Sequence, residues 1–301
     1  MILSFIGLVI GLTMLIWGAD QLVDGAAGVA KRWNISGHVI GVTLVATATS
    51  LPELVTAVYA TITGNHGIAV GNVVGSNAFN VGIVLAVGVL LVPVKPDKLV
   101  IKDGWVVILA TMVFAVFAVG GIVRLEALTL LIFYILYVFH LSRTTEFTGE
   151  LDVKEKPIPL LVIMLVVGMV LLGFGGPVVV HSAVSLSKAL GVSESLIALT
   201  LIALGTSLPE LITTVVASLK GHEGMAVGNV LGSNLFNFLM IPGISALIHP
   251  LSVEGYMAGA LIPAVLILTL LGVLLSRKKM GRKEGVLLLM GYSAFAVLLF
   301  T

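Results

Sequence analysis

Long apolar stretches separated by short polar segments dominate the pattern along this chain. Most of them reach the roughly 20 residues that cross a hydrocarbon layer about 30 Å thick. Because a backbone within lipid must satisfy its own hydrogen bonds, continuous apolar runs predict helices rather than strands. The pattern predicts ten transmembrane helices, over residues 2–24, 37–62, 67–93, 104–123, 126–142, 158–187, 195–219, 224–248, 256–276 and 284–300.

The composition agrees with a protein that lies in lipid. Hydrophobic residues make up 58% of the chain and charged residues 10%, whereas about 25% of a soluble domain is charged. An ordinary soluble globule is therefore excluded, and we expect an all-α integral membrane protein that crosses the cell membrane many times. The net charge of +1 gives no reason to expect a nucleic acid partner. The absence of cysteine excludes disulfides and thiolate metal sites.

The basic residues predict the orientation of the helices. With the N-terminus outside, 14 of the 16 Lys and Arg residues fall in inward loops, and only Arg124 and Lys188 fall outside. Loops on the cytoplasmic side carry the excess of Lys and Arg in membrane proteins. This distribution therefore predicts that both termini lie outside.

An internal repeat is the strongest signal in the sequence. The segment that begins at Ile40 and ends at Asn80 matches the segment from Ile197 to Asn237 without a gap, and 25 of 41 paired positions are identical. The offset is 157 residues, as in Glu53 and Glu210. Such identity indicates duplication of a structural unit.

The duplication predicts two halves that cross the membrane in opposite directions. The first repeat covers 1–144, a polar cytoplasmic linker covers 145–157, and the second repeat covers 158–301, with five helices in each repeat. Because five is odd, the second repeat enters from the other side, which makes an inverted-topology repeat. Substrate sites in such folds lie near the membrane midplane, on broken helices at the repeat interface.

The motif TSLPE occurs at 49–53 and again at 206–210, near the middle of an apolar stretch. A carboxylate at that depth is costly and indicates function. Pro52 and Pro209 lack an N–H, so they free the carbonyls of Ala48 and Gly205. One helical turn then offers a carboxylate, two hydroxyls and loosened carbonyl oxygens. These are hard ligands suited to Na⁺ or Ca²⁺.

The motif GNVxGSNxFN also occurs twice and adds neutral oxygens. Asn72, Ser76 and Asn80 share one helix face, as do their counterparts Asn229, Ser233 and Asn237. We expect Ser76, Asn80, Ser233 and Asn237 to be ligands, and Asn72 and Asn229 to hold helices together. Asn77 and Asn234 fit either role. Gly71 and Gly75 form a small-xxx-small pattern that allows close approach of another helix.

Other polar residues are weaker candidates. Asp20 and Asp24 lie toward the inner end of the first helix, and their counterparts at offset 157 are Pro177 and His181. We interpret them as interfacial or as lining an entry path. The histidines show no metal-ligand spacing, and no hydrolase, metalloprotease or nucleotide-binding motif occurs. We therefore expect no enzyme and no cofactor.

With two copies each of the TSLPE and GNxxGSN motifs, the whole chain resembles the cation/calcium antiporter superfamily, and within it the prokaryotic sodium/calcium exchangers. The resemblance implies exchange of several Na⁺ for one Ca²⁺ at a site on the second, third, seventh and eighth helices. It also implies that the first and sixth helices slide as a gate. The ligand set that it implies is Thr49, Ser50, Glu53, Ser76, Asn80, Thr206, Ser207, Glu210, Ser233 and Asn237, with the carbonyls of Ala46 and Ala203.

Two positions depart from that family's pattern. Ala48 stands where the family usually has a glycine, which is still present in the second motif as Gly205. Alanine adds only a methyl group, so we expect subtle effects on helix bending or affinity. Asn237 stands where some relatives carry aspartate, and an acid there often accompanies potassium co-transport, so the resemblance argues against K⁺ coupling. We expect a Na⁺/Ca²⁺ antiporter that works as a monomer in the bilayer. A H⁺/Ca²⁺ antiporter of the same fold and a passive cation channel are the alternatives.

Overall fold

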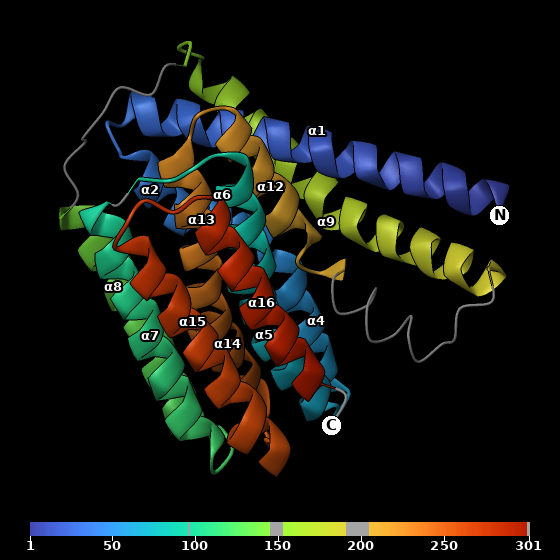
Figure 1. Cartoon of the computed structure of the whole chain (residues 1–301), viewed down its shortest axis with the longest axis vertical. Coiled ribbons are helices and arrows are strands. Elements are labelled where there is room, and N and C mark those ends of the chain that lie inside the picture. Colours follow the sequence, from blue (N-terminus) through green and yellow to red (C-terminus); the bar gives the residue numbers. More distant parts are fainter. Residues whose placement is uncertain (96, 145–152, 191–204, 300–301) are drawn as a thin grey trace.

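The computed structural model describes residues 1–95, 97–144, 153–190 and 205–299. These residues form helices, and the only β pairing among them is two isolated bridges, Val94 with Met280 and Ile122 with Leu251. The predicted all-α class is therefore confirmed. Figure 1 shows most helices standing in one bundle.

The helices of the first half follow the predicted apolar stretches. Their bounds are α1 Ile2–Arg32, α2 Gly37–Ile40, α3 Ala46–Thr49, α4 Leu51–Ile62, α5 His66–Phe79, α6 Ala86–Leu91, α7 Lys98–Ala118 and α8 Arg124–Thr144. Two wider π-helical segments, η1 Gly41–Val45 and η2 Asn80–Leu85, continue α2 and α5. Helix α1 extends eight residues beyond the predicted end at residue 24.

The second half repeats this order over its described residues. Its elements are α9 Ile158–Ala189, α12 Leu208–Leu219, α13 Glu223–Leu235, η4 Phe236–Met240, α14 Ile241–Ile248, η5 Met257–Leu261, α15 Ile262–Ser276 and α16 Arg282–Leu298. The π-helical segment η4 contains Asn237, the counterpart of the Asn80 that begins η2. Such π segments concentrate at functional sites.

Seven helices among the described residues are long and apolar enough to cross a membrane. The pair Gly37–Thr49 and Leu51–Ile62, bent by 46°, makes an eighth span if the pair is counted as one. Helix α12 is described over 12 residues, and the rest of the predicted span 195–219 lies largely outside the described part. The total of ten spans stays a prediction.

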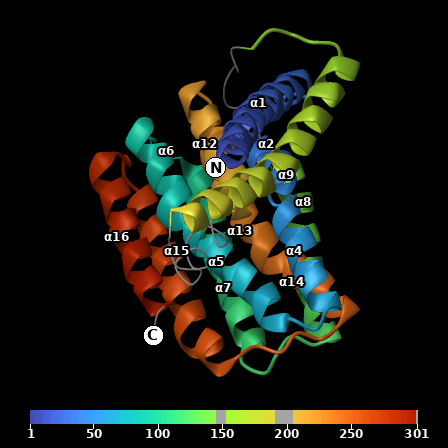
Figure 2. The ribbon, with the colours of Figure 1, turned by 90° about the vertical axis from the view of Figure 1, so that its right-hand side faces the viewer.

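Helices α1 and α9 form a separate pair on one side of the bundle, and both views show them lying along each other (Figures 1 and 2). Glycines make this contact close. A Cβ built on Gly11 would come within 3.1 Å of the Gly175 carbonyl, and one built on Gly18 within 3.2 Å of the Gly168 carbonyl. Gly11 and Gly168 are 157 residues apart, as are Gly18 and Gly175. The contact therefore exchanges equivalent positions of the two repeats, as a pseudo-two-fold axis requires.

The connections between helices gather at two opposite ends. At one end the bridge between Val94 and Met280 joins the loop before α7 to the loop before α16. At the other end the bridge between Ile122 and Leu251 joins the loops after α7 and α14. This is the grouping expected when the helices alternate in direction as the sequence predicts.

Candidate cation site

The first half of the site is a helix break at Ser50. Its backbone leaves the helical region at φ −87° and ψ 6°, while its N–H still donates to the Ala46 carbonyl at 3.0 Å. Pro52 lies in the first turn of the next helix, where its missing N–H costs nothing. Ser207 has φ −92° and ψ 6°, with Pro209 in the first turn of α12. The two serines thus adopt the same backbone conformation, and each motif begins a helix, α4 and α12.

Each break carries a glutamate that is bound by the serine of the other break. Ser50 Oγ donates to Glu210 Oε1 at 3.0 Å, and Ser207 Oγ donates to Glu53 Oε1 at 3.1 Å. All four side chains are fully buried. Residues of the two repeats that are about 160 positions apart therefore meet in one centre, and the contact is reciprocal.

Both carboxyl groups keep one oxygen without a hydrogen bond. Glu53 Oε2 and Glu210 Oε2 are buried and have no hydrogen-bond partner among the described residues. Among the described residues neither glutamate makes an ion pair with Lys, Arg or His. Burial of a charge without a partner is costly. The arrangement therefore suits a bound cation, which would take the free oxygens as ligands.

The neutral residues of the predicted ligand set gather in the same buried region. Thr49, Asn80, Ser233 and Asn237 have no exposed surface, and Ser76 has 2%. Thr49 Oγ1 lies 3.4 Å from Ser233 Oγ and 3.2 Å from the Ala46 carbonyl oxygen. Within the described part of the chain, both amide atoms of Asn80 and of Asn237 lack a hydrogen-bond partner. These groups can supply cation ligands without adding charge.

Two members of the predicted ligand set, Thr206 and Ala203, are not among these buried residues. Thr206 is partly exposed, whereas its counterpart Thr49 is fully buried. Ala203, whose carbonyl the resemblance adds, lies outside the described residues. Asn77, which sequence left open between two roles, donates Nδ2 to the Val73 carbonyl of its own helix at 2.6 Å.

The close helix approach predicted for Gly71 and Gly75 lies instead at their counterparts. Among the described residues, the only atom near a Cβ on Gly71 is Met257 Cε at 3.7 Å, and a Cβ on Gly75 would meet none within 4 Å. A Cβ on Gly232 would lie 2.6 Å from Val42 Cα and from Ala46 Cβ. One on Gly228 would lie 3.0 Å from the Val42 nitrogen. These glycines bring α13 against the first half of the broken helix.

Asp20 and Asp24 lie apart from this centre and are paired. Lys220 Nζ, in the turn between α12 and α13, lies 2.6 Å from Asp20 Oδ1 and 2.5 Å from Asp24 Oδ1. Burial by itself lowers the pKa of Lys220, but its hydrogen bonds to Asp20 and Asp24 outweigh burial and raise the pKa above the ordinary 10.5. A lysine whose pKa is raised in the folded protein contributes its full stabilisation at every pH below its ordinary pKa. These pairs therefore stay intact at neutral pH.

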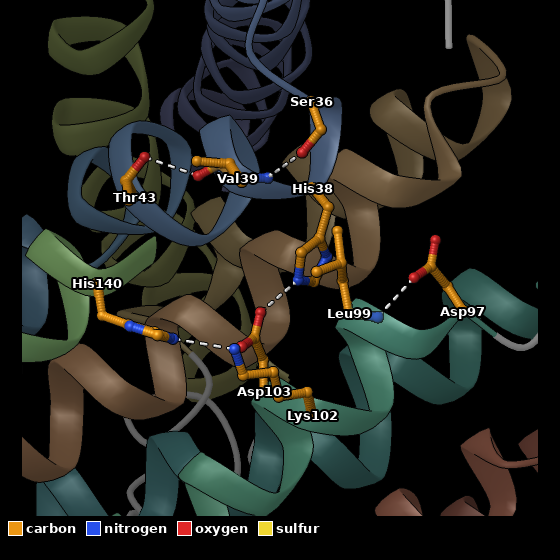
Figure 3. A network of polar contacts seen from close by, with 9 residues as sticks. All are labelled: Ser36, His38, Val39, Thr43, Asp97, Leu99, Lys102, Asp103 and His140. Carbon is orange, nitrogen blue, oxygen red and sulfur yellow. Dashed lines mark hydrogen bonds and ion pairs between the residues drawn. The ribbon is translucent and has the colours of Figure 1, made fainter. Parts of the chain in front are cut away.

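A buried pair of side chains, unlike the partly exposed pairs of Lys220, anchors the start of the broken helix. His38 Nε2 lies 2.7 Å from Asp103 Oδ2, and both residues are almost fully buried. Figure 3 shows this contact joining α2 to α7, beside the Ser36 hydroxyl that accepts from the Val39 N–H at 3.2 Å. The pair positions the segment that leads into the first motif.

Comparison with known proteins agrees with this geometry. The family profile described as "Sodium/calcium exchanger protein" matches residues 3–143 and again residues 160–301. The chain belongs to the sodium/calcium exchanger family. A profile that matches twice, once in each half, also agrees with the internal repeat.

Individual relatives cover the whole length. The chain is 34% identical to sodium/calcium exchanger MaX1 of Methanosarcina acetivorans, over 99% of this chain and 98% of that protein. It is 35% identical to the putative antiporter CaxA of Alkalimonas amylolytica, over 100% of both chains. A solved structure of the sodium–calcium exchanger NCX_Mj superposes with a TM-score of 0.87 and 31% identity, covering 98% of this chain and 97% of that chain.

Family membership makes this protein a multi-pass cell-membrane transporter of the cation/Ca²⁺ antiporter type. Na⁺ and Ca²⁺ are its family's substrates, and the family works without a cofactor. Sequence reasoning alone missed the reciprocal Ser–Glu contacts and the π-helical segments. The offset of 157 could have suggested the reciprocity, because a two-fold axis through a site exchanges equivalent residues.

Proposed function

We propose that this protein exchanges Na⁺ for Ca²⁺ by alternating access at the centre formed by the two TSLPE motifs. The single observation that carries the proposal is the pair of buried glutamates, each with one oxygen bound by a serine and one oxygen without a partner. Two carboxylates neutralise one Ca²⁺, and the neutral oxygens around them bring the ligand number into the 6–8 range of calcium.

The proposed ligands are the residues that the sequence motifs mark. They are Glu53, Glu210, Thr49, Ser50, Thr206, Ser207, Ser76, Asn80, Ser233 and Asn237, with the backbone carbonyls of Ala46 and Ala203. The buried clustering of the described members other than Thr206 supports this assignment.

Sodium coupling is favoured over proton coupling by the kind of atoms present. Hydroxyl, amide and carbonyl oxygens around two carboxylates offer several small oxygen cages, whereas a proton needs only one acceptor. Replacement of one Ca²⁺ by several Na⁺ uses all of these oxygens. The H⁺/Ca²⁺ antiporter of the same fold is the second candidate, because buried carboxyl groups can also carry protons.

Movement of the α1–α9 pair is the proposed route to alternating access. The two helices pack against each other through glycines, and they lie beside the bundle that contains α4 and α12 with the two carboxylates (Figure 2). A pair joined by close backbone contacts can move as one body. We further propose that the protein works as a monomer with both termini outside.

Uptake of radioactive calcium into proteoliposomes tests the coupling. We expect an outward Na⁺ gradient to drive uptake and a pH gradient alone to drive little. Equal uptake with either gradient would favour the proton antiporter. Uptake that only follows the Ca²⁺ gradient, without need of a counter-ion, would indicate a channel and refute exchange.

A further inference from the structure

Asn72 and Asn229 make contacts that go beyond holding helices together. Asn72 Nδ2 donates to the carbonyl of Glu53 at 3.1 Å, and its Oδ1 accepts from Thr206 Oγ1 at 3.3 Å. Asn229 Nδ2 donates to the carbonyl of Glu210 at 3.4 Å, and its Oδ1 accepts from Thr49 Oγ1 at 3.1 Å. Each asparagine thus holds the glutamate backbone of its own repeat and the threonine hydroxyl of the other.

These contacts determine the orientation of the two hydroxyl groups. A threonine hydroxyl has one hydrogen and two lone pairs. It can ligate a cation only through a lone pair, so its hydrogen must be donated elsewhere. The asparagine Oδ1 is fixed as the acceptor, because the amide nitrogen is used by the glutamate carbonyl.

The choice of acceptor matters most for Thr49. Its single hydrogen can go to Asn229 Oδ1 at 3.1 Å, to the Ala46 carbonyl at 3.2 Å or to Ser233 Oγ, itself a proposed ligand, at 3.4 Å. Donation to Ala46 would occupy a carbonyl that is itself a proposed ligand. Donation to Asn229 leaves both the Thr49 lone pairs and the Ala46 carbonyl available to the ion.

We propose that Asn72 and Asn229 are positioning residues that turn the hydroxyl oxygens of Thr206 and Thr49 toward the transported cation. This inference rests on the proposed function, since it assumes that the buried centre binds Ca²⁺ and Na⁺. It predicts an effect on ion affinity that a purely structural contact would not have.

Asn229 has one contact that Asn72 lacks, and this contact allows a positioning role to be tested separately from a packing role. Asn229 Nδ2 also lies 3.0 Å from Thr214 Oγ1, whereas the counterpart of Thr214 is Ala57, which has no hydroxyl. Asn229 is fully buried and Asn72 is partly exposed. Thr214→Ala removes only the additional contact, so we expect it to leave Ca²⁺ affinity unchanged.

Equilibrium binding of radioactive calcium to the purified full-length protein tests the proposal, with melting temperature measured on the same samples. Outer groups that orient a ligand typically change metal affinity by about 10–100-fold. We expect Asn72→Ala and Asn229→Ala each to weaken Ca²⁺ binding by about tenfold in the folded fraction. The matched control is Thr214→Ala, since it removes the additional contact of Asn229 at 3.0 Å and leaves every proposed ligand in place.

A double-mutant cycle identifies the mechanism. If Asn72 acts through the hydroxyl of Thr206, adding Asn72→Ala to Thr206→Val should weaken binding little further. The same cycle with Asn229→Ala and Thr49→Val tests the second repeat, so one variant that fails to fold leaves the other cycle to decide. Unchanged affinity in the asparagine variants, or losses that multiply fully within a cycle, would overturn the positioning role. A wild-type protein that binds no Ca²⁺ would refute the proposed function instead.

Discussion

The carboxyl groups of Glu53 and Glu210 are the residues in which burial and charge conflict most strongly. Both are fully buried, and each receives one serine hydrogen bond. One hydroxyl donor does not compensate for the loss of water around an ionised carboxylate. A cation shared by both carboxylates removes the conflict, so the two groups are expected to act together on one divalent ion.

The first prediction concerns these two residues. Glu53→Gln and Glu210→Gln should each nearly abolish Ca²⁺ exchange, because a single carboxylate does not neutralise a divalent ion. Sodium-driven uptake of radioactive calcium in proteoliposomes is the measurement. Asp20→Asn and Asp24→Asn serve as controls that remove a charge outside the centre, and much milder effects are expected. Wild-type exchange in either glutamine variant would place the ion site elsewhere.

For individual residues, the sequence predicted which side chains would be buried together but not which of them would form hydrogen bonds with each other. The duplicated motifs marked Glu53 and Glu210 because charged residues are rare in apolar stretches. The bond from Ser50 to Glu210 joins residues that are 160 positions apart. Such a contact depends on how the repeats dock, and no local pattern contains that information.

The broken helices show which features of an element the sequence determines. Pro52 predicted a disruption, and the break lies at Ser50, two residues earlier, because proline is accommodated in the first turn of the following helix. The predicted end of the first helix at residue 24 was too early, since α1 continues to Arg32 past its apolar part. The π-helical segments at Asn80 and Asn237 had no signal in the apolar pattern.

The second prediction concerns the contact between α13 and the broken helix. Gly232→Ala should lower the melting temperature and reduce exchange, because the added methyl would lie 2.6 Å from Val42 Cα and from Ala46 Cβ. Overpacking of this kind costs about 1–3 kcal/mol. Gly259→Ala is the control, as a Cβ there meets no described atom within 4 Å. Equal melting temperatures of the two variants would contradict the close contact.

The third prediction concerns the ion pairs between α1 and the turn after α12. Their counterparts in the other repeat, Pro177, His181 and Thr63, cannot form such pairs. Lys220→Gln should therefore ease opening on one face only, the face predicted to be cytoplasmic. Partly exposed ion pairs contribute about 0.2–1 kcal/mol each. We expect exchange to persist, with a roughly two- to fivefold lower half-saturating Ca²⁺ concentration on that face and a higher one on the opposite face.

Transport into vesicles of both orientations measures this asymmetry. Lys95→Gln is the matched control, because Lys95 is an exposed lysine in the loop at the same end of the bundle. Because the raised pKa of Lys220 keeps the pairs intact below pH 10.5, the asymmetry should not change between neutral and mildly alkaline pH. An equal change of affinity on both faces would show that the pairs do not distinguish the two conformations.

At the scale of the whole molecule, the pseudo-two-fold relation explains why contacts occur in exchanged pairs. The Ser–Glu bonds, the Asn–Thr bonds and the glycine contacts of α1 with α9 each occur twice, and equivalent residues in the two copies differ by 157 positions. In the predicted topology the two halves insert in opposite directions, which gives a site that either face can reach. Under the proposed alternating access, we expect small differences between the halves to decide which face opens more easily.

The fourth prediction is the sidedness of the loops. Single cysteines can be introduced into a chain that has none. Cysteines at Lys98 and Lys279 should be labelled only from the cytoplasmic side, and a cysteine at Asn65 only from outside. The bridge between Val94 and Met280 brings the first two loops together, and the contact of His66 with Ser252 at 3.0 Å holds the third loop at the other end. Labelling of Asn65 and Lys279 from the same side would refute the inverted repeat.

The fifth prediction follows from the charge that one transport cycle moves. If more than two Na⁺ leave for each Ca²⁺ that enters, the cycle carries net positive charge out of the vesicle. Each net charge that crosses the membrane changes the free energy by about 2.3 kcal/mol per 100 mV. With Na⁺ inside and Ca²⁺ outside, an inside-positive potential should therefore accelerate Ca²⁺ uptake, and an inside-negative potential should slow it. Ionophore-clamped proteoliposomes provide the measurement, with the Glu53→Gln variant as the background. Uptake that does not respond to voltage would indicate two Na⁺ per Ca²⁺, since that exchange moves no net charge.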